Sequence, residues 1–291
     1  MTGTSEAAER RAAMPAGTER FLETRSLRAD HRRLAALLQP GMSVLDVGCG
    51  SGAITRGIAE AVGAGGRVVG IDISEQLLAR ALTTHGGPPN LEFEIADVTR
   101  HRYRDEFDVV TAARVLQWLA DPRAALASMV AAAKPGGQII VLDYNHLRAR
   151  WEPEPPEPFS RFYDAFLAWR ADAGMDNEMA DHLAAMMTEL ELADVTATQE
   201  LEVTSRGDGD FETRMALWPG VIATRGHQLV ADGLLDEAGR EAAGEAFAQW
   251  IATDARSQTL HLLAVSARKP QTPAPRRPGP APSPAPRHLD P

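Results

Sequence analysis

Three glycines at alternate positions follow a short apolar run early in the chain. The nine residues Val44–Gly52 read VLDVGCGSG, and a helical pattern begins directly after them. Glycine has no Cβ, so it adopts unusual backbone angles and lets a ligand approach the main chain closely. The free N–H groups at the start of the following helix favour a small charged ligand. The spacing G-x-G-x-G differs from both the dinucleotide fingerprint and the phosphate-binding loop.

Acidic residues end the next two predicted strands, at Asp72 and Asp97. A carboxylate at the end of the second strand can accept hydrogen bonds from both hydroxyls of a ribose. A carboxylate after the third strand can accept from an adenine amino group, while the N–H of Val98 can donate to a ring nitrogen. The alternatives are a helix cap for Asp72, although Ser74 already fits that role, and a solvated loop position for Asp97.

Short apolar strands alternate with helices through the first half of the chain, which is typical of a parallel sheet buried on both faces. Right-handed crossovers then give the α/β class, a Rossmann-like doubly wound sheet with ligands at the carboxyl ends of its strands. We expect seven strands, mostly parallel, with an antiparallel last strand. A first helix is predicted over 18–38, with Thr18 as its cap. The predicted strands are 44–47, 67–71, 91–95, 107–111, 138–143, 195–204 and 257–268.

One domain is expected over residues 18–269, after a disordered N-terminus at 1–17. The tail at 270–291 contains nine prolines and is expected to be disordered. Helical insertions at about 150–192 and 211–256 interrupt the strand–helix alternation. We expect them to form a lid over the ligand edge of the sheet.

The composition limits the partners and the compartment. A net charge of −10 disfavours phosphate backbones, so no nucleic acid partner is expected. No apolar run is long enough for a membrane helix, so no membrane partner is expected. The single cysteine, Cys49, excludes an intramolecular disulfide and fits the cytoplasm. No metal site is predicted, and the chain is expected to be a monomer or a homodimer.

Together these segments resemble the class I S-adenosylmethionine-dependent methyltransferases, in particular the type 11/25-like branch that acts on small molecules. The likeness is dense over residues 30–145 and general elsewhere. The segments that carry it, in the order of the family's motifs, are Val44–Gly52, Gly70–Asp72, Ala96–Val98, Phe107–Val110 and Lys134–Gly137.

The resemblance implies S-adenosylmethionine as the methyl donor and S-adenosylhomocysteine as the product. It places Asp46 and Gly48 beside the methionine moiety, Asp72 on the ribose and Ile73 on the adenine. It also implies that Arg114 borders the sulfonium. The implied cofactor-binding residues are Asp46, Gly48, Cys49, Gly50, Gly52, Asp72, Ile73, Asp97, Val98 and Arg114.

Two further roles remain open. Arg25 or Arg28 of the first predicted helix would hold the methionine carboxylate, or else lie on a solvated helix face. Cys49 is either a small packed residue in the loop or a reactive thiol, and the absence of a second cysteine favours the first interpretation.

The acceptor is expected after the fourth strand and under the insertions. Gln117-Trp118 resembles the corresponding segment of small-molecule carboxyl methyltransferases, while core packing is the alternative for Trp118. An aromatic helix over 159–169 either lines the acceptor pocket or packs the insertion onto the sheet. The predicted substrate-binding residues are Gln117, Trp118, Trp151, Tyr163 and His227.

A general base is needed only if the acceptor is a neutral hydroxyl or a carbon acid. His146, which follows the fifth strand, is the first candidate, and Tyr144 is the second. A lone histidine is more often a surface residue or one with its hydrogen bonds satisfied.

The sequence therefore predicts an enzyme that moves a sulfonium methyl group to a small molecule by in-line displacement, mainly through proximity and orientation. One alternative is a methyltransferase that acts on RNA or protein, which a basic groove would favour. The other is a non-methylating protein that binds S-adenosylmethionine with the same fold, which failure to release S-adenosylhomocysteine would favour.

Overall fold

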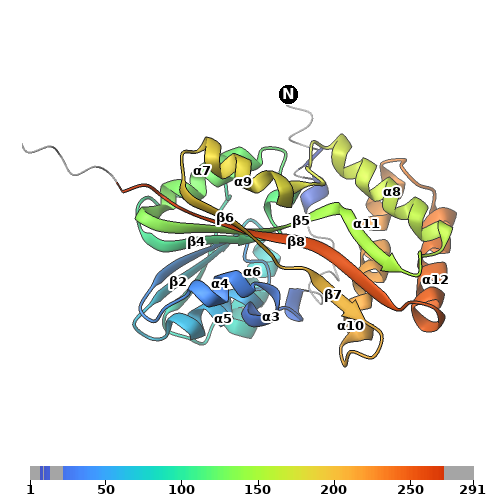
Figure 1. The fold of residues 1–291 in the computed structure, drawn as a ribbon, viewed down its shortest axis with the longest axis horizontal. Coiled ribbons are helices and arrows are strands. Elements are labelled where there is room, and N and C mark those ends of the chain that lie inside the picture. The colour runs from blue at the N-terminus through green and yellow to red at the C-terminus, as the bar shows by residue number, and fades with distance from the viewer. Residues whose placement is uncertain (1–6, 9, 14–21, 272–291) are drawn as a thin grey trace, which may run out of the picture.

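The structure, a computed structural model, describes residues 7–8, 10–13 and 22–271 (Figure 1). Thr18 and nearly all of the proline-rich tail lie outside the described residues. The described strands are β1 (Ser43–Val47), β2 (Arg67–Asp72), β3 (Leu91–Ile95), β4 (Phe107–Ala113), β5 (Ala133–Glu152), β6 (Ala193–Gln199), β7 (Glu202–Ser205) and β8 (Ser257–Arg268).

These strands form one sheet in the order β3-β2-β1-β4-β5-β8-β6, with β7 also paired to β8. The first five are parallel to one another, and β8 runs antiparallel to β5, β6 and β7. The predicted α/β class and the mostly parallel sheet with an antiparallel last strand are confirmed. The predicted count of seven is wrong, because the single strand expected over 195–204 is two strands, β6 and β7.

Glu200 explains that break. Its side chain is only 5% exposed and accepts the backbone N–H groups of Arg32 and Arg33. These residues begin α4 (Arg32–Leu37), so the carboxylate meets the positive end of a helix. Glu200 lies between β6 and β7, and its inward side chain ties this break in the strand to the start of α4.

Helices cover both faces of the sheet. Alternate strand residues enter two different cores, as Val44 and Leu45 do. α4 and α5 pack below the sheet in Figure 1, and α7 and α9 pack above it. The helices of this part are α3 (Leu27–Asp30), α5 (Ala53–Val62), α6 (Glu75–His85), the 3₁₀ turn η1 (Leu116–Trp118), α7 (Pro122–Ala132) and α9 (Met179–Glu189).

The first helix, predicted to be continuous over 18–38, is interrupted. Ser26 has extended backbone angles and caps α3 through a 3.3 Å hydrogen bond from the N–H of Ala29. His31 separates α3 from α4, since its buried ring reaches Thr111 of β4, with Nε2 and Oγ1 3.1 Å apart. A tertiary contact therefore overrides the local helical pattern.

The insertions form a second layer against the far ends of β5 and β8. It consists of α8 (Glu157–Asp172), α10 (Phe211–Met215), α11 (Leu217–Ala231) and α12 (Glu237–Thr253), on the right in Figure 1. These helices share an aromatic core with both strands. β5 is much longer than predicted, because it continues past a register shift between Asn145 and Arg150 to reach this layer.

The sequence predicts disorder over residues 1–17, but the described part of this N-terminal segment is ordered. Residues 7–8 and 10–12 are helical. Arg11 is 6% exposed, donates from Nε to Asp232 at 2.9 Å, and stacks 5.1 Å from the ring of Trp169. Burying its guanidinium against α8 and α11 orders this segment.

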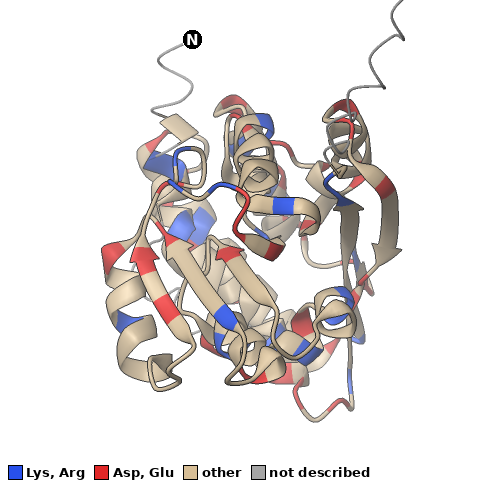
Figure 2. Cartoon of the chain, turned by 90° about the vertical axis from the view of Figure 1, so that its left-hand side faces the viewer, with Lys and Arg blue, Asp and Glu red and all other residues tan. Residues whose placement is uncertain are grey.

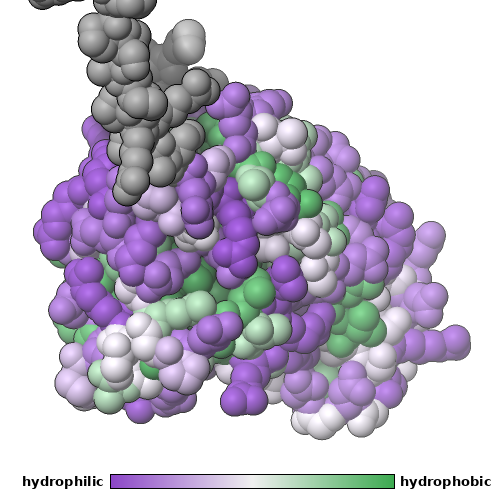
Figure 3. Space-filling view, turned by 60° about the vertical axis from the view of Figure 1, so that its left-hand side comes forward, coloured by the Kyte–Doolittle hydropathy of each residue, from purple (hydrophilic) through white to green (hydrophobic). Residues whose placement is uncertain are grey.

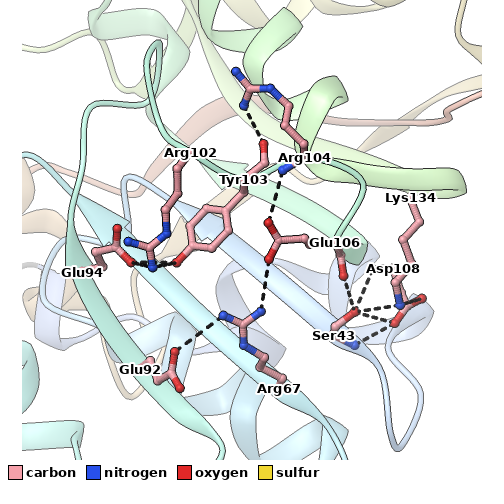
Figure 4. A network of polar contacts seen from close by, with 10 residues as sticks. All are labelled: Ser43, Arg67, Glu92, Glu94, Arg102, Tyr103, Arg104, Glu106, Asp108 and Lys134. Atoms are coloured by element: carbon pink, nitrogen blue, oxygen red, sulfur yellow. Dashed lines mark hydrogen bonds and ion pairs between the residues drawn. The ribbon is translucent and has the colours of Figure 1, made fainter.

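Polar contacts join the strands at their amino ends (Figure 4). The Lys134 ammonium lies 2.7 Å from the Asp108 carboxylate, which also accepts the N–H of Ser43 at 2.8 Å. Arg67 lies between Glu92 and Glu106, at 3.7 and 3.6 Å. A hollow of about 470 Å³ opens at this edge, and the paired Lys134 and Asp108 belong to its lining. This edge lies opposite the carboxyl ends where ligands of such sheets bind.

Acidic and basic residues are interspersed along the ribbon seen from this side (Figure 2). Hydrophilic residues cover most of the view in Figure 3, and apolar residues show mainly in recesses between them. No helix of the described part of the chain is long and apolar enough to cross a membrane.

Candidate active site

The glycine loop lies at the carboxyl end of β1. Gly48, Gly50 and Gly52 have φ angles of 68°, 55° and 80°, which residues other than glycine rarely adopt. A Cβ atom on Gly48 would lie 2.5 Å from Cγ2 of Val115, and one on Gly52 would lie 2.6 Å from Cζ of Phe93. Both backbone angle and space therefore require glycine at these positions.

Two carboxylates flank this loop. Asp46 is buried and accepts a 2.6 Å hydrogen bond from the hydroxyl of Thr55. Burial raises the pKa of Asp46 to about 7, and the charge of Asp72 adds to the rise. Asp72 accepts the N–H groups of Gly50 and Ser74, one on each oxygen and both at 2.9 Å, while burial raises its pKa. Positive charge on a ligand would relieve the repulsion between these two groups.

Ile73 and Asp97 continue the same edge beyond the loop. The side chain of Ile73 is 72% exposed, which leaves an apolar surface beside Asp72. Asp97 is engaged locally, because it accepts from Thr99 and pairs with Arg100 at 2.9 Å. Burial works to raise the pKa of Asp97, but these partners outweigh it and lower that pKa. A glycine cradle, two carboxylates and an exposed apolar side chain fit an adenosyl ligand that carries positive charge.

Cys49 fits the packed interpretation better than the reactive one. Burial, with the charges of Asp46 and Asp72, raises the pKa of its thiol well above the ordinary value, so the thiol stays protonated. Among the described residues, no group of three or more His, Cys, Asp or Glu side chains is arranged to hold a metal ion.

Arg114 begins a buried polar cluster after β4. Its Nε donates to the hydroxyl of Tyr144 at 3.1 Å, and its Nη2 pairs with Glu202 and donates to the carbonyl of Asp30. Its Nη1 is buried without a partner in the described part of the chain. Burial and the charge of Arg114 lower the pKa of Arg25, which lies beside the same cluster.

Tyr144 bridges this cluster. Its hydroxyl lies 3.3 Å from Glu202 as well as within reach of Arg114. Burial raises the pKa of Tyr144 to about 12, and the charge of Glu202 adds to the rise while Arg114 and Arg25 oppose it. A phenol that keeps its proton at neutral pH is a poor general base.

His146 lies beside Tyr144, and their rings stack with centroids 5.3 Å apart. Its Nε2 lies 2.6 Å from Oε1 of Gln117, and its backbone carbonyl accepts the hydroxyl of Tyr163 at 2.7 Å. Burial and the charge of Arg170 lower the pKa of His146 well below the ordinary value, so the ring is neutral. The structure thus brings both predicted base candidates and two of the predicted acceptor residues together.

Trp118 is held between two cations. The guanidinium groups of Arg170 and Arg225 lie 4.4 and 4.0 Å from its ring centroid. Ala8 and Ala12 of the N-terminal segment belong to the same apolar cluster. The contacts favour the packing alternative for this residue.

Trp151 and Tyr163 belong to the aromatic core between the insertion and β5. Their ring centroids are 5.0 Å apart, and the indole N–H of Trp151 donates to Gln258 at 2.9 Å. Trp218 lies 4.9 Å from Tyr163, and its indole N–H is buried without a partner in the residues described here. The insertion therefore presents aromatic rings close to His146.

Two predicted residues lie elsewhere. The side chain of His227 is 58% exposed on α11 and lies 3.8 Å from Glu237, so none of its contacts in the described chain joins the cluster. The structure therefore does not bring His227 together with the other predicted substrate-binding residues. Arg28 is exposed as well, which fits the solvated alternative.

Several polar residues at the site escaped the sequence analysis. Asp143 is fully buried and accepts the N–H groups of Gln117 and Tyr144, and burial raises its pKa to about 7. Asp143 ends a predicted strand, as Asp72 does, so an acidic residue at a strand end was the signal that could have identified it. Arg170 and Glu202 gave no signal, since charged residues in a helix or an edge strand ordinarily face solvent.

A sequence profile described as a methyltransferase domain matches residues 38–199, more than half of the chain. The ubiquinone/menaquinone biosynthesis C-methyltransferase UbiE of Burkholderia vietnamiensis is 35% identical over 146 residues, which cover 47% of this chain and 56% of that protein. The chain thus spans about half the length of such curated relatives.

Solved structures share the fold. Phosphoethanolamine N-methyltransferase 2 of Haemonchus contortus, in complex with S-adenosyl-L-methionine, has a TM-score of 0.52 at 19% identity, covering 93% of this chain and 57% of that one. The [4+2]-cyclase SpnF has a TM-score of 0.50 at 19% identity, covering 82% and 81%. One of these proteins is named as an N-methyltransferase and the other as a cyclase, so at this sequence identity the two structures support the fold alone.

Proposed function

Because this chain belongs to the methyltransferase domain family, whose cofactor is S-adenosylmethionine, we propose that it transfers the sulfonium methyl group to a small-molecule acceptor. The observation that carries the proposal is the loop Gly48–Gly52 between the carboxylates of Asp46 and Asp72. Those groups match a ligand that has a ribose at one end and positive charge at the other.

The chain's own residues would bind and orient the cofactor. Asp72 would accept the ribose hydroxyls, Ile73 would pack on the adenine, and Asp46 would face the positively charged methionine end. Gly48, Cys49, Gly50 and Gly52 would supply the close backbone approach. Asp97 and Val98 would bind the edge of the adenine ring. To do so, the carboxylate of Asp97 must give up some of its contacts to Thr99 and Arg100.

The acceptor would lie between the loop and the aromatic insertion, near Arg114 and His146. S-adenosylmethionine supplies a methyl group that is already activated on sulfur. Alignment by the protein can provide roughly 7–11 kcal/mol of the barrier. His146 would take the acceptor's proton, and the electron pair left behind forms the bond to the methyl carbon as the carbon–sulfur bond breaks onto sulfur.

The name of the Burkholderia relative and the rings of Trp151, Tyr163 and Trp218 support a planar aromatic or quinol-like acceptor. We propose one methyltransferase domain over residues 18–269, with the insertion as a lid over the acceptor. We keep the expectation of no nucleic acid partner, because the net charge of −10 disfavours phosphate backbones. We also keep the cytoplasm, and a monomer or homodimer, as proposals.

The test is incubation of the full chain with methyl-labelled S-adenosylmethionine and three acceptor classes: quinols, carboxylates and amines. Label in a small product, with release of S-adenosylhomocysteine, supports the proposal. Label transferred to RNA or protein supports the macromolecule alternative. Tight cofactor binding with no release for any acceptor supports a non-methylating protein.

A further inference from the structure

We propose that Gln117 is a positioning residue that holds His146 as a neutral imidazole with its proton on Nε2, so that Nδ1 is available to accept a proton. The inference rests on the proposed methyl transfer with His146 as its base. Under this inference Gln117 orients His146, whereas the sequence predicts that it contacts the acceptor.

The orientation of the Gln117 amide follows from its two partners. Its Nε2 lies 3.4 Å from the carbonyl oxygen of Arg114, which can only accept a hydrogen bond. The amide NH₂ must therefore face Arg114, and Oε1 must face His146. Oε1 is an acceptor 2.6 Å from the imidazole Nε2, so that nitrogen must carry the proton.

Gln117 is itself fixed by its backbone. Its N–H donates to Asp143 at 3.1 Å, and its carbonyl accepts from Nη2 of Arg170 at 2.9 Å. The residue is only 2% exposed. The backbone of Gln117 is thus fixed on both sides, and its amide is held at Arg114, so the side chain can set the orientation of the ring that it touches.

The backbone of His146 is held as firmly. Its N–H donates to the carbonyl of Asn177 at 2.8 Å, and its own carbonyl accepts the hydroxyl of Tyr163. One face of the ring stacks on Tyr144, and Phe166 meets it edge-on at 5.9 Å. In the described part of the chain, the hydrogen bonds of His146 are made by Nε2 and by its backbone N–H and carbonyl, and none involves Nδ1.

The charged and titratable groups around this pair favour the neutral ring. Arg170 lies on α8, Tyr163 lies on the same helix, and Tyr144 and Asp143 precede His146 on β5. Burial and the charge of Arg170 both lower the pKa of His146. Burial raises the pKa of Tyr144 and Tyr163, so both phenols keep their protons, and it raises the pKa of Asp143 to about 7, so that carboxyl is partly protonated at neutral pH. The ring of His146 is thus neutral near neutral pH, and Nδ1 carries the lone pair that can accept a proton.

The experiment is nitrogen NMR of the full chain with isotope-labelled histidine, without cofactor or acceptor. The His146→Gln variant assigns the signals by their loss. We expect His146 as the neutral tautomer protonated on Nε2 at about pH 6, near the ordinary pKa of histidine. A proton on Nδ1, or a charged ring at that pH, would overturn the inference.

A second pair of variants separates positioning from folding. Gln117→Glu puts a carboxylate beside Nε2, so the charged ring of His146 should appear at a higher pH than in the unmodified chain. Gln76→Glu makes the same charge change at an exposed position and should leave the His146 titration unchanged. Equal titration curves for both variants would contradict the proposal. Calorimetry with S-adenosylmethionine on the same samples tests the proposed function separately, because the histidine signals need no ligand.

Discussion

The carboxylate of Asp72 accepts the backbone N–H of Gly50 at 2.9 Å, so the end of β2 holds the loop that follows β1. The same carboxylate is the group that we propose for the ribose. Binding of the ribose and the conformation of the glycine loop are therefore coupled through one side chain.

This coupling predicts the effect of Asp72→Ala. Each hydrogen bond to a charged group contributes about 1.5–3 kcal/mol, and about 1.4 kcal/mol corresponds to a tenfold change in affinity. We expect S-adenosylmethionine to bind at least tenfold more weakly, as measured by calorimetry. Asp164→Ala removes an exposed carboxylate of α8 and should leave the affinity unchanged. Equal affinities for the two variants would argue against a role of Asp72 in binding.

Asp46 predicts a pH dependence of cofactor binding. Its pKa is raised to about 7 mainly by burial, so the carboxylate is partly protonated at neutral pH. Only its charged form attracts a cation, so affinity for S-adenosylmethionine should rise as the pH increases through about 7. Asp46→Asn should reduce this dependence, and any titration of the ligand itself is common to both proteins. Calorimetry at several pH values measures the affinity of both proteins. If the affinities of the unmodified chain and of Asp46→Asn changed with pH in the same way, Asp46 would not be the source of the dependence.

Asp143 predicts a pH dependence of stability. Its pKa is raised to about 7 in the folded chain, mainly by burial, whereas an unfolded aspartate titrates near about 3.9. The folded state binds this proton more tightly, so the group's contribution to the unfolding free energy falls between about pH 4 and 7 and is constant above. The loss is on the order of 4 kcal/mol.

Urea unfolding across this pH window measures the effect. Asp143→Asn should show a smaller decrease between about pH 4 and 7 than the unmodified chain. If the unfolding free energy decreased equally in both proteins, Asp143 would not be the cause of the pH dependence.

Arg11 predicts a stabilising role for the N-terminal segment. Its guanidinium is buried against Trp169 and donates to Asp232 at 2.9 Å. Arg11→Ala should lower the unfolding free energy by about 1–3 kcal/mol, because the Asp232 carboxylate and the Trp169 carbonyl lose a charged donor. Arg10→Ala is the matched control, since the Arg10 side chain is 64% exposed and lies 3.5 Å from the same aspartate. If both variants lost the same stability in urea, the segment would not be held by Arg11.

The sheet and the cofactor edge could be predicted because local signals carry them. Glycine spacing marks the loop, and Asp72 stands directly after an apolar run that only a buried strand explains. The order of strands and helices then fixes which strand ends meet. The length of β5 could not be read in the same way, because its second half pairs with β8 from a distant part of the sequence.

The polar cluster around Arg114 depends on tertiary contacts. Glu202 is an ordinary residue in an edge strand until β8 brings it to Arg114, and Glu200 breaks its strand only because α4 begins beside it. His31 ends a helix for the same kind of reason, through Thr111. Such pairings join residues far apart in the chain, and no local pattern encodes them.

Calorimetry of the full chain with S-adenosylmethionine and with NAD distinguishes a methyl-donor site from a dinucleotide site. The G-x-G-x-G loop with Asp46 and Asp72 predicts saturable binding of S-adenosylmethionine and S-adenosylhomocysteine, and no binding of NAD at the same concentrations. Tight binding of NAD without binding of S-adenosylmethionine would show that the glycine loop is not an S-adenosylmethionine site.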